Sequence, residues 1–429
     1  MSKLLIQGGR IIDPSQQINR VADLVLCDGK VEGIDIPVSE PDTIVDAKGK
    51  IVCPGLVDMH VHLREPGREE DETIATGTAA AVAGGVTSMA CMPNTEPALD
   101  NQAAAEFIYL QAARAAKANV YPIGTVSKGR SGQELAEMGG LVEGGAVAFS
   151  DDGDPVSNSQ LMRRALEYAL MLDKAVFSHC EIKELTVGGV MHEGDVSLKL
   201  GLPGLPAVAE EIMVNRDIAL AELTGGRLHI LHASTAGTVD LVRNARRRGI
   251  SVTTEAMPHN FILTDECLER FDSDFIMYPP LRAASDVEAI IEGLVDGTIE
   301  VIATDHAPHA VEKKMKELDH APFGVMGLET LIPICIRALI EPGHLSWPAL
   351  IEKLTINPSK LLGINKGTLQ NGVDGDVTII DPDVPWTVDP KKFHSKSRNS
   401  PFKGWEVSGR AYMTIVGGET KYRLSDMQD

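Results

Sequence analysis

The sequence predicts an α/β fold in which a TIM-type (β/α)8 barrel carries a small β-sandwich formed by the N- and C-terminal segments. Three observations predict it. Short strands fill both ends of the chain, strand and helix patterns alternate eight times between them, and polar residues follow several of these strands. Strands that alternate with helices are typical of a parallel sheet, and eight such units are typical of a closed barrel.

Both ends of the chain have the pattern of short strands without helices. Four strands are predicted near the start, at 3–12, 22–27, 30–34 and 43–46, and two near the end, at 376–381 and 411–416. Gly, Asp and Pro turn signals separate them. We expect the two ends to pair into one sandwich. The predicted division assigns 1–54 and 356–429 to the sandwich and 55–355 to the barrel.

The central segment supplies the eight units of the barrel. Its apolar strands are predicted at 56–63, 85–92, 120–126, 146–151, 175–180, 227–233, 251–256 and 301–307. The helices between and after them are predicted at 73–83, 101–117, 132–144, 159–173, 206–224, 236–248, 284–296 and 327–340. In barrels of this kind the residues that carry the chemistry lie at the carboxyl ends of the strands.

Composition limits the classes of function. The 429 residues are 43% hydrophobic, enough for a large buried core, and 40 Lys and Arg stand against 61 Asp and Glu, a formal charge of -21. That charge argues against nonspecific binding to nucleic acid or to anionic membranes. The six cysteines have no paired spacing, the start has no signal-peptide profile, and no apolar run reaches membrane-spanning length. We therefore expect a cytoplasmic protein.

Polar residues follow the predicted strands in a pattern that suggests a metal site. Residues i and i+2 of a strand share a face, so His60 and His62 in the first strand point the same way. Further polar residues end the second, fourth, fifth, sixth and eighth strands: Asn94, Asp151, Asp152, His179, His232 and Asp305. Imidazole and carboxylate ligands without paired thiolates are expected of a hydrolytic Zn²⁺ site that keeps one position open for water.

Each histidine also has a structural interpretation. Taken singly, His179 or His232 is more simply a hydrogen-bonded core residue, and only their common position at strand ends favours a metal site. His229 is expected to be structural or to support a metal ligand from behind. Three histidines in loops or outside the barrel are expected at the surface: His192, His344 and His394.

Five motifs stand at or just after strand ends: VDMHVHLREPG at 57–67, MPNT at 92–95, SDDG at 150–153, HAST at 232–235 and TDHAPH at 304–309. Together they resemble the dihydroorotases of the bacterial type I class, in the amidohydrolase superfamily. The resemblance runs across nearly the whole chain and includes GLET at 327–330 and SKSRNSPF at 395–402. It implies reversible cyclisation of N-carbamoyl-L-aspartate to L-dihydroorotate, with loss of water, in de novo pyrimidine biosynthesis.

The same resemblance implies a ligand set and a mechanism. It places one or two Zn²⁺ ions per subunit, with the following residues as ligands: His60, His62 and Asp305 for one ion, His179 and His232 for the second, and Asp152 as the bridge. Zinc-bound hydroxide would attack the ring amide in the hydrolytic direction. Asp305 would shuttle the proton to the leaving nitrogen.

Further residues are implied to bind the substrate beside His62. Arg64, Asn94 and His309 would meet its carboxylate, and the backbone of Phe323 and Gly324, in a lid loop at 310–324, would meet the ring. The family usually has an asparagine before Pro279-Pro280. This chain has Tyr278, which cannot present the paired donor and acceptor of an amide.

Two alternatives stay open at this point. One is a hydantoinase, dihydropyrimidinase or allantoinase relative acting on another cyclic amide, which the change at Tyr278 keeps open. The other is a non-catalytic partner of aspartate carbamoyltransferase, although every implied ligand is present. An active enzyme could also bind that partner, and a homo-oligomer is expected.

Overall fold

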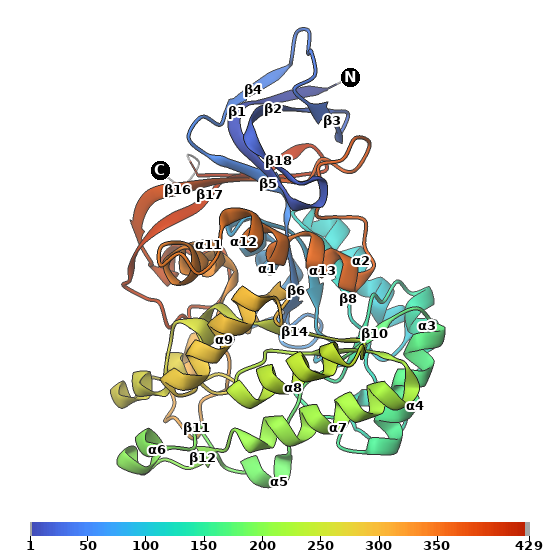
Figure 1. Ribbon diagram of the computed structural model, residues 1–429, viewed down its shortest axis with the longest axis vertical. Coiled ribbons are helices and arrows are strands. Elements are labelled where there is room, and N and C mark those ends of the chain that lie inside the picture. Colours follow the sequence, from blue (N-terminus) through green and yellow to red (C-terminus); the bar gives the residue numbers. More distant parts are fainter. Residues whose placement is uncertain (1, 425–429) are drawn as a thin grey trace.

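The computed structural model describes residues 2–424 and contains the predicted barrel (Figure 1). Its eight strands are β6 (Leu56–Val61), β7 (Val86–Cys91), β8 (Asn119–Pro122), β9 (Phe149–Ser150), β10 (Ala175–Ser178), β13 (Arg227–Ile230), β14 (Val252–Ala256) and β15 (Val301–Ile302). Neighbouring strands run parallel. Single parallel bridges close the ring, from Gly124 to Phe149 and from Val61 to His306.

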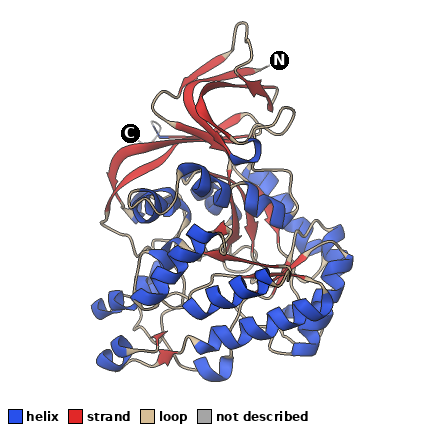
Figure 2. Ribbon diagram, in the orientation of Figure 1, coloured by secondary structure: helices blue, strands red, loops and turns tan. Residues whose placement is uncertain are grey.

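The helices around the barrel follow the predicted order, as the helix and strand colours of Figure 2 make plain. They are α1 (Ile74–Ala83), α2 (Gln102–Ala115), α3 (Met138–Glu143), α4 (Ser159–Met171), α7 (Val208–Thr224), α8 (Ala236–Arg247), α9 (Ala284–Asp296) and α11 (Leu331–Cys335). Side-chain caps begin several of them. Thr73 accepts from Thr76 N at α1, and Asn158 accepts from Gln160 N at α4.

Two helix predictions are partly wrong. Of the helix predicted at 132–144 only α3 forms, because Gly132 has φ +68° and the preceding stretch is extended, with Ser127 bridged to Leu135. The helix predicted at 327–340 forms as one continuous helical stretch from Leu328 to Ile340 but is not a regular α-helix throughout: a 3-10 turn at Leu328–Thr330 leads into α11 and then a π-helix at Ile336–Ile340. Pro333 lacks the N–H that a regular helix would use at that point.

Several strands are shorter than predicted at the end that carries the polar residues. The last one stops at Ile302 instead of 307, and the sixth stops at Ile230 instead of 233. His232 and Asp305 have φ of +33° and +48°, which extended backbone does not adopt. The chain therefore leaves the sheet just before the residues expected to be functional.

The strands from both chain ends form one continuous eight-stranded sheet, which lies above the barrel in Figure 1. They are β1 (Lys3–Asp13), β2 (Ile18–Cys27), β3 (Lys30–Ile34), β4 (Thr43–Asp46), β5 (Ile51–Pro54), β16 (Val377–Thr387), β17 (Glu406–Val416) and β18 (Glu419–Arg423). β5 pairs antiparallel with β16, from Ile51 with Ile380 to Pro54 with Val377. The expected pairing of the two chain ends is confirmed, while the exact division at 54 and 355 stays a prediction.

The remaining elements connect or cover these two parts. They are α5 (Lys183–Thr186), β11 (Met191–His192), α6 (Asp195–Leu200), β12 (Gly204–Leu205), α10 (Val311–Lys314), α12 (Trp347–Leu354) and α13 (Ile356–Leu362). Leu362 of α13 packs in one core cluster with Val57 and Met59 of β6. Within residues 2–424, no helix is both long and apolar enough to cross a bilayer.

Candidate metal centre and substrate pocket

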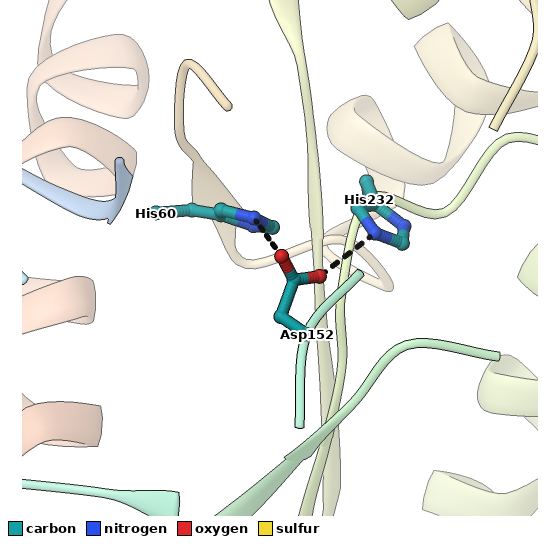
Figure 3. A group of neighbouring side chains, drawn as sticks. All are labelled: His60, Asp152 and His232. Carbon is teal, nitrogen blue, oxygen red and sulfur yellow. Dashed lines mark ion pairs between the residues drawn. The ribbon is translucent and has the colours of Figure 1, made fainter. Parts of the chain in front are cut away.

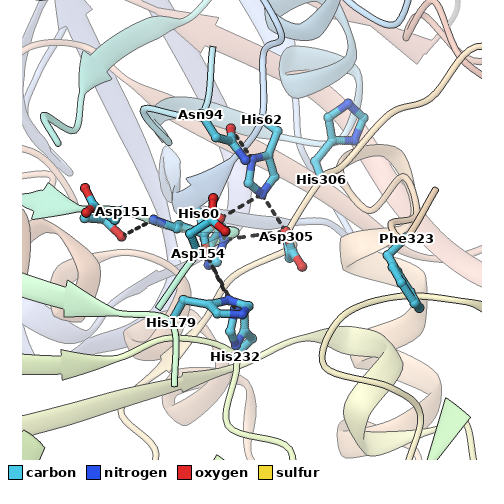
Figure 4. A network of polar contacts seen from close by, with 12 residues as sticks. His60, His62, Asn94, Asp151, Asp154, His179, His232, Asp305, His306 and Phe323 are labelled. Carbon is cyan, nitrogen blue, oxygen red and sulfur yellow. Dashed lines mark hydrogen bonds and ion pairs between the residues drawn. The ribbon is translucent and has the colours of Figure 1, made fainter. Parts of the chain in front are cut away.

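The predicted metal ligands converge at the carboxyl ends of the barrel strands (Figure 4). His60 lies in β6 and His62 follows it, and both direct Nε2 toward the Oδ1 atom of Asp305, at 3.4 Å and 2.8 Å. His179 follows β10 and His232 follows β13, and His179 Nδ1 lies 2.9 Å from His232 Nε2. All five side chains are at least nine-tenths buried.

Asp152 lies between the two histidine pairs, and Figure 3 shows it between His60 and His232. Its Oδ2 is 3.7 Å from His60 Nε2 and 3.5 Å from His62 Nε2. Its Oδ1 is 3.4 Å from both His179 Nδ1 and His232 Nε2. Each carboxylate oxygen therefore faces one pair of histidines.

The donor atoms of this centre fit a bound metal ion. Two overlapping groups have ligand atoms within 4.8 Å of one another: His60 with Asp152 and His232, and His60 with His62 and Asp305. Within the described chain, His60 Nε2 and Asp152 Oδ1 are buried without a hydrogen-bond partner. Buried polar atoms are normally paired, so a cation at this point would satisfy them.

The hydrogen bonds of the first histidine pair also favour metal binding. His60 Nδ1 lies 2.5 Å from Glu255 Oε1, and His62 Nδ1 lies 2.9 Å from Asn94 Oδ1. A ring that donates its Nδ1 proton to such an acceptor keeps the lone pair of Nε2 for a metal. With a cation bound, the Nε2 lone pairs of both rings would be directed at it, beside Asp305.

Both carboxylates of the centre are held in their ionised form. Burial opposes ionisation of Asp152, but the charge of His60 and the close contacts with His179 and His232 outweigh it, so its pKa lies well below the usual value. Burial likewise opposes ionisation of Asp305, and the His60 charge together with the His62 contact holds its pKa below the usual value. Anionic oxygens are thus available to a hard or borderline cation.

Glu255 is a functional residue that sequence reasoning missed. It lies in β14, accepts from His232 N at 3.3 Å through Oε1, and has Oε2 3.4 Å from His229 Nε2. The expectation that His229 is structural agrees with this position, since its ring packs behind Glu255. The sequence offered one signal for this role: Glu255 is a charged residue within the otherwise uncharged strand β14.

A cavity of about 470 Å³ adjoins the metal centre and is lined by the residues predicted to bind substrate: His62, Arg64, Asn94, Tyr278, His309, Phe323 and Gly324. Arg64 is 4% exposed and donates from Nε to Pro308 O at 3.2 Å. In residues 2–424 it forms no ion pair with a carboxylate. A buried guanidinium of this kind needs an anion to offset its lost hydration.

His309 holds the lid loop in place beside Arg64. Its Nε2 donates to Phe323 O at 2.7 Å. Burial, and then the charge of Arg64, lowers the pKa of His309 to about 2, so the ring is neutral. Gly324 has φ +131°, and a Cβ there would lie 2.7 Å from the Ala307 Cβ, so the turn requires glycine.

Tyr278 uses its hydroxyl in a hydrogen bond to Glu181, which also lines the cavity. The phenol donates to Glu181 Oε1 at 2.6 Å, and its ring stacks on His179 with centroids 5.7 Å apart. Phe323 meets it edge-on at 5.0 Å. Tyr278 therefore presents an aromatic face where an amide was expected, and its hydrogen bond is made to the protein.

One surface prediction is wrong. His192 is only 9% exposed, because it lies within β11, pairs with Leu205 of β12, and has its Nδ1 3.2 Å from Arg282 Nη1. His344 is exposed as expected. His394 is half-buried and pairs with Glu329 at 3.0 Å.

Solved structures with this architecture define the class of protein. An L-hydantoinase (dihydropyrimidinase) from Arthrobacter aurescens matches with a TM-score of 0.88 and 27% identity, covering 98% of this chain and 96% of that one. A D-hydantoinase (dihydropyrimidinase) from Thermus sp. matches with a TM-score of 0.83 and 26% identity, covering 99% and 96%. Together with the buried histidine and aspartate groups, they identify a metal-dependent cyclic amidohydrolase.

Sequence relatives then identify the family. Residues 49–238 match the family described as Dihydro-orotase-like. A dihydroorotase from Pelotomaculum thermopropionicum is 55% identical over 97% of both chains, and one from Acetivibrio thermocellus is 52% identical over 98% of this chain and 99% of its own. The chain belongs to the dihydroorotase family and is an enzyme of pyrimidine biosynthesis. The hydantoinase likeness is thus one of fold and superfamily.

Proposed function

We propose that this pocket interconverts N-carbamoyl-L-aspartate and L-dihydroorotate by means of bound zinc. The observation that carries the proposal is the buried, unpaired guanidinium of Arg64 in the same cavity as the metal centre. A cyclic amide that also bears a carboxylate would satisfy both features. A neutral cyclic amide would leave the charge of Arg64 without an anionic partner.

The proposed ligands form two groups, one on each side of the Asp152 carboxylate. His60, His62 and Asp305 would hold one Zn²⁺, and His179 and His232 a second. The separate contacts of Asp152 Oδ2 and Oδ1 with the two histidine pairs support a bridging role. Bound zinc supplies a water that ionises near pH 7 and stabilises negative charge on the amide oxygen.

Asp305 is proposed to move the proton. Its carboxylate lines the cavity, and its lowered pKa keeps it ionised and able to accept a proton at neutral pH. In the hydrolytic direction it would then protonate the ring nitrogen as the amide bond breaks. In the cyclising direction it would accept the proton from the attacking nitrogen.

The remaining lining residues would orient the substrate. The Nε of Arg64 donates to Pro308 O, so Arg64 would bind the substrate carboxylate through its two Nη groups. Asn94 Oδ1 contacts His62, so Asn94 would donate to the substrate from Nδ2. His309 would support this subsite by fixing Phe323. Backbone groups of Phe323 and Gly324 would meet the ring, with the face of Tyr278 beside them.

Substitution of Arg64 tests this assignment. Arg64→Met should lower kcat/KM for L-dihydroorotate by about a hundredfold or more, because a charge-assisted bidentate contact is lost. Hydrolysis of hydantoin, which has no carboxylate, should change little. Arg247→Met, which removes an exposed arginine of α8, is the matched control. Equal losses for both substrates at unchanged zinc content would contradict the carboxylate role.

The wider context is also a proposal. We expect a cytoplasmic homo-oligomer that can associate with aspartate carbamoyltransferase, whose product is the substrate assigned here. Co-sedimentation of the two proteins, with rates measured for each alone and together, tests the association. A purely non-catalytic role is disfavoured by the complete set of ligands.

A further inference from the structure

A second arginine lines the cavity that contains Arg64. Arg68 follows four residues later in the loop after β6, and its N donates to Arg64 O at 3.0 Å. Its Nη2 donates to Asn94 O at 2.8 Å, which ties the side chain to another wall of the cavity. The position of Arg68 is thus fixed by two residues already assigned to substrate binding.

The guanidinium of Arg68 keeps unused donors. Its Nε is buried and has no hydrogen-bond partner within the described chain, and no carboxylate in residues 2–424 forms an ion pair with it. The acids that follow it in sequence are engaged elsewhere: Glu70 and Asp71 both contact Lys313 Nζ, at 2.7 Å and 2.8 Å. The charge of Arg68 contributes to the lowered pKa of Glu70, but no carboxylate of the described chain lies within ion-pair distance of its guanidinium.

The two arginines are close enough to repel each other. Burial lowers the pKa of Arg64 to about 10, and the charge of Arg68 is the next largest cause. The charge of Arg68 also contributes to the lowered pKa of His309. Two unpaired cations beside one cavity are unfavourable until an anion lies between them.

We infer that Arg68 is a second substrate-binding arginine, which together with Arg64 forms a two-guanidinium subsite for the carboxylate that both N-carbamoyl-L-aspartate and L-dihydroorotate retain. The inference rests on the proposed function and extends it. A carboxylate has two oxygens and about four acceptor sites, so it can accept from both arginines at once. Arg68 then contributes affinity for the anion in both reaction directions.

Steady-state kinetics and binding of Arg68→Met test the inference. The KM for L-dihydroorotate should rise about tenfold with kcat unchanged, as expected when binding is lost equally from ground and transition state. Arg68→Lys should restore part of the loss, because it keeps the charge without the fork. Calorimetric titration with orotate, which needs no turnover, should show a similar weakening, whereas uracil, its counterpart without the carboxylate, should bind both proteins alike.

Salt dependence and controls separate the outcomes. Raising the ionic strength should weaken orotate binding by the wild type more than by Arg68→Met, since one cation is already absent. Arg247→Met should match the wild type, and zinc content and unfolding temperature report on folding. An Arg68→Met variant with wild-type KM and orotate affinity would overturn the inference alone. A fully metallated wild type that neither hydrolyses L-dihydroorotate nor binds orotate would overturn the proposed substrate as well.

Discussion

Three residues of the site adopt a left-handed backbone that amino acids other than glycine rarely use. Arg64, His232 and Asp305 have φ of +61°, +33° and +48°. Such conformations cost roughly 1–3 kcal/mol each and persist where surrounding contacts impose them. Here His232 N is held by Glu255, and Thr304, beside Asp305, donates from Oγ1 to Asp58 Oδ2 at 2.5 Å. These contacts hold the backbone at His232 and Asp305, where the chain leaves the sheet and both side chains line the cavity.

Asp305 is the residue whose chemistry can be removed with the least change of shape. Asp305→Asn keeps the volume but cannot accept a proton as a carboxylate does, so kcat should fall by about a thousandfold or more. Circular dichroism should show an intact barrel. Zinc content must be measured on the same sample, because the amide is the weaker ligand.

An exposed aspartate provides the comparison. Asp383→Asn in β16 should leave kcat unchanged. If Asp305→Asn with full zinc turned over at a near-normal rate, the proton-transfer role would be excluded and another group would have to accept the proton.

At the scale of elements, the segment after β16 fixes the loops around the cavity. Asn399 is 2% exposed, its Oδ1 accepts from His309 N at 3.1 Å, and its Nδ2 donates to Ala307 O and Gly324 O at 3.1 Å and 3.0 Å. Lys314 Nζ also reaches Gly324 O, at 3.2 Å. A C-terminal segment therefore holds Gly324, at the end of the lid loop, across a sequence separation of 75 residues.

Asn399→Ala should loosen this turn. It leaves buried backbone groups unpaired, each worth about 1–3 kcal/mol, so the unfolding temperature should fall by several degrees. KM for L-dihydroorotate should rise about tenfold while zinc content stays constant, because the ligands lie on other elements. Asn244→Ala, in an exposed position of α8, serves as the control. An unchanged KM would show that the lid turn is fixed without Asn399.

At the scale of the whole molecule, the sequence predicts well those features of the fold that follow from the periodic pattern of apolar residues in strands and helices. Alternating strands and helices place His60, His179, His232 and Asp305 at one end of the barrel, because parallel strands end together. Glu255 was missed because its partner His60 is 195 residues away, and nothing local marks that contact.

The wrong predictions have the same origin in long-range structure. His192 was predicted to be exposed because its segment has the composition of a loop. It is buried because this segment forms the inserted β11–β12 pair, which no periodicity in the sequence indicates. No prediction was made for Arg68, because nothing local in its loop distinguishes it from an exposed cation; its position in the cavity wall and its contact with Asn94 O appear only in the folded chain.

Buried neutral histidines should make the folded molecule sensitive to acid. Burial lowers the pKa of His259 to about 4, and burial with the charge of Arg64 lowers that of His309 to about 2. In the unfolded chain both titrate near 6.5. As the pH falls below about 6.5, the unfolded state gains protons that the folded state does not, so stability is lost progressively toward the folded pKa values, by up to about 1.4 kcal/mol per pH unit for each group.

His259→Gln should therefore flatten the decline of the unfolding temperature between about pH 7 and pH 5, because one of the two groups no longer contributes. The carboxylates with lowered pKa act in the same direction but mainly below about pH 4. Asp58 and Asp274, whose pKa burial raises to about 6, act in the opposite direction within this window, but equally in the wild type and the variant, so the difference in slope reports on His259. Zinc kept in excess holds the ligating histidines neutral. His320→Gln, which removes a histidine with a 70% exposed side chain, should leave the slope unchanged. A wild-type slope in His259→Gln would mean that His259 accepts a proton in the folded state and that acid sensitivity arises elsewhere.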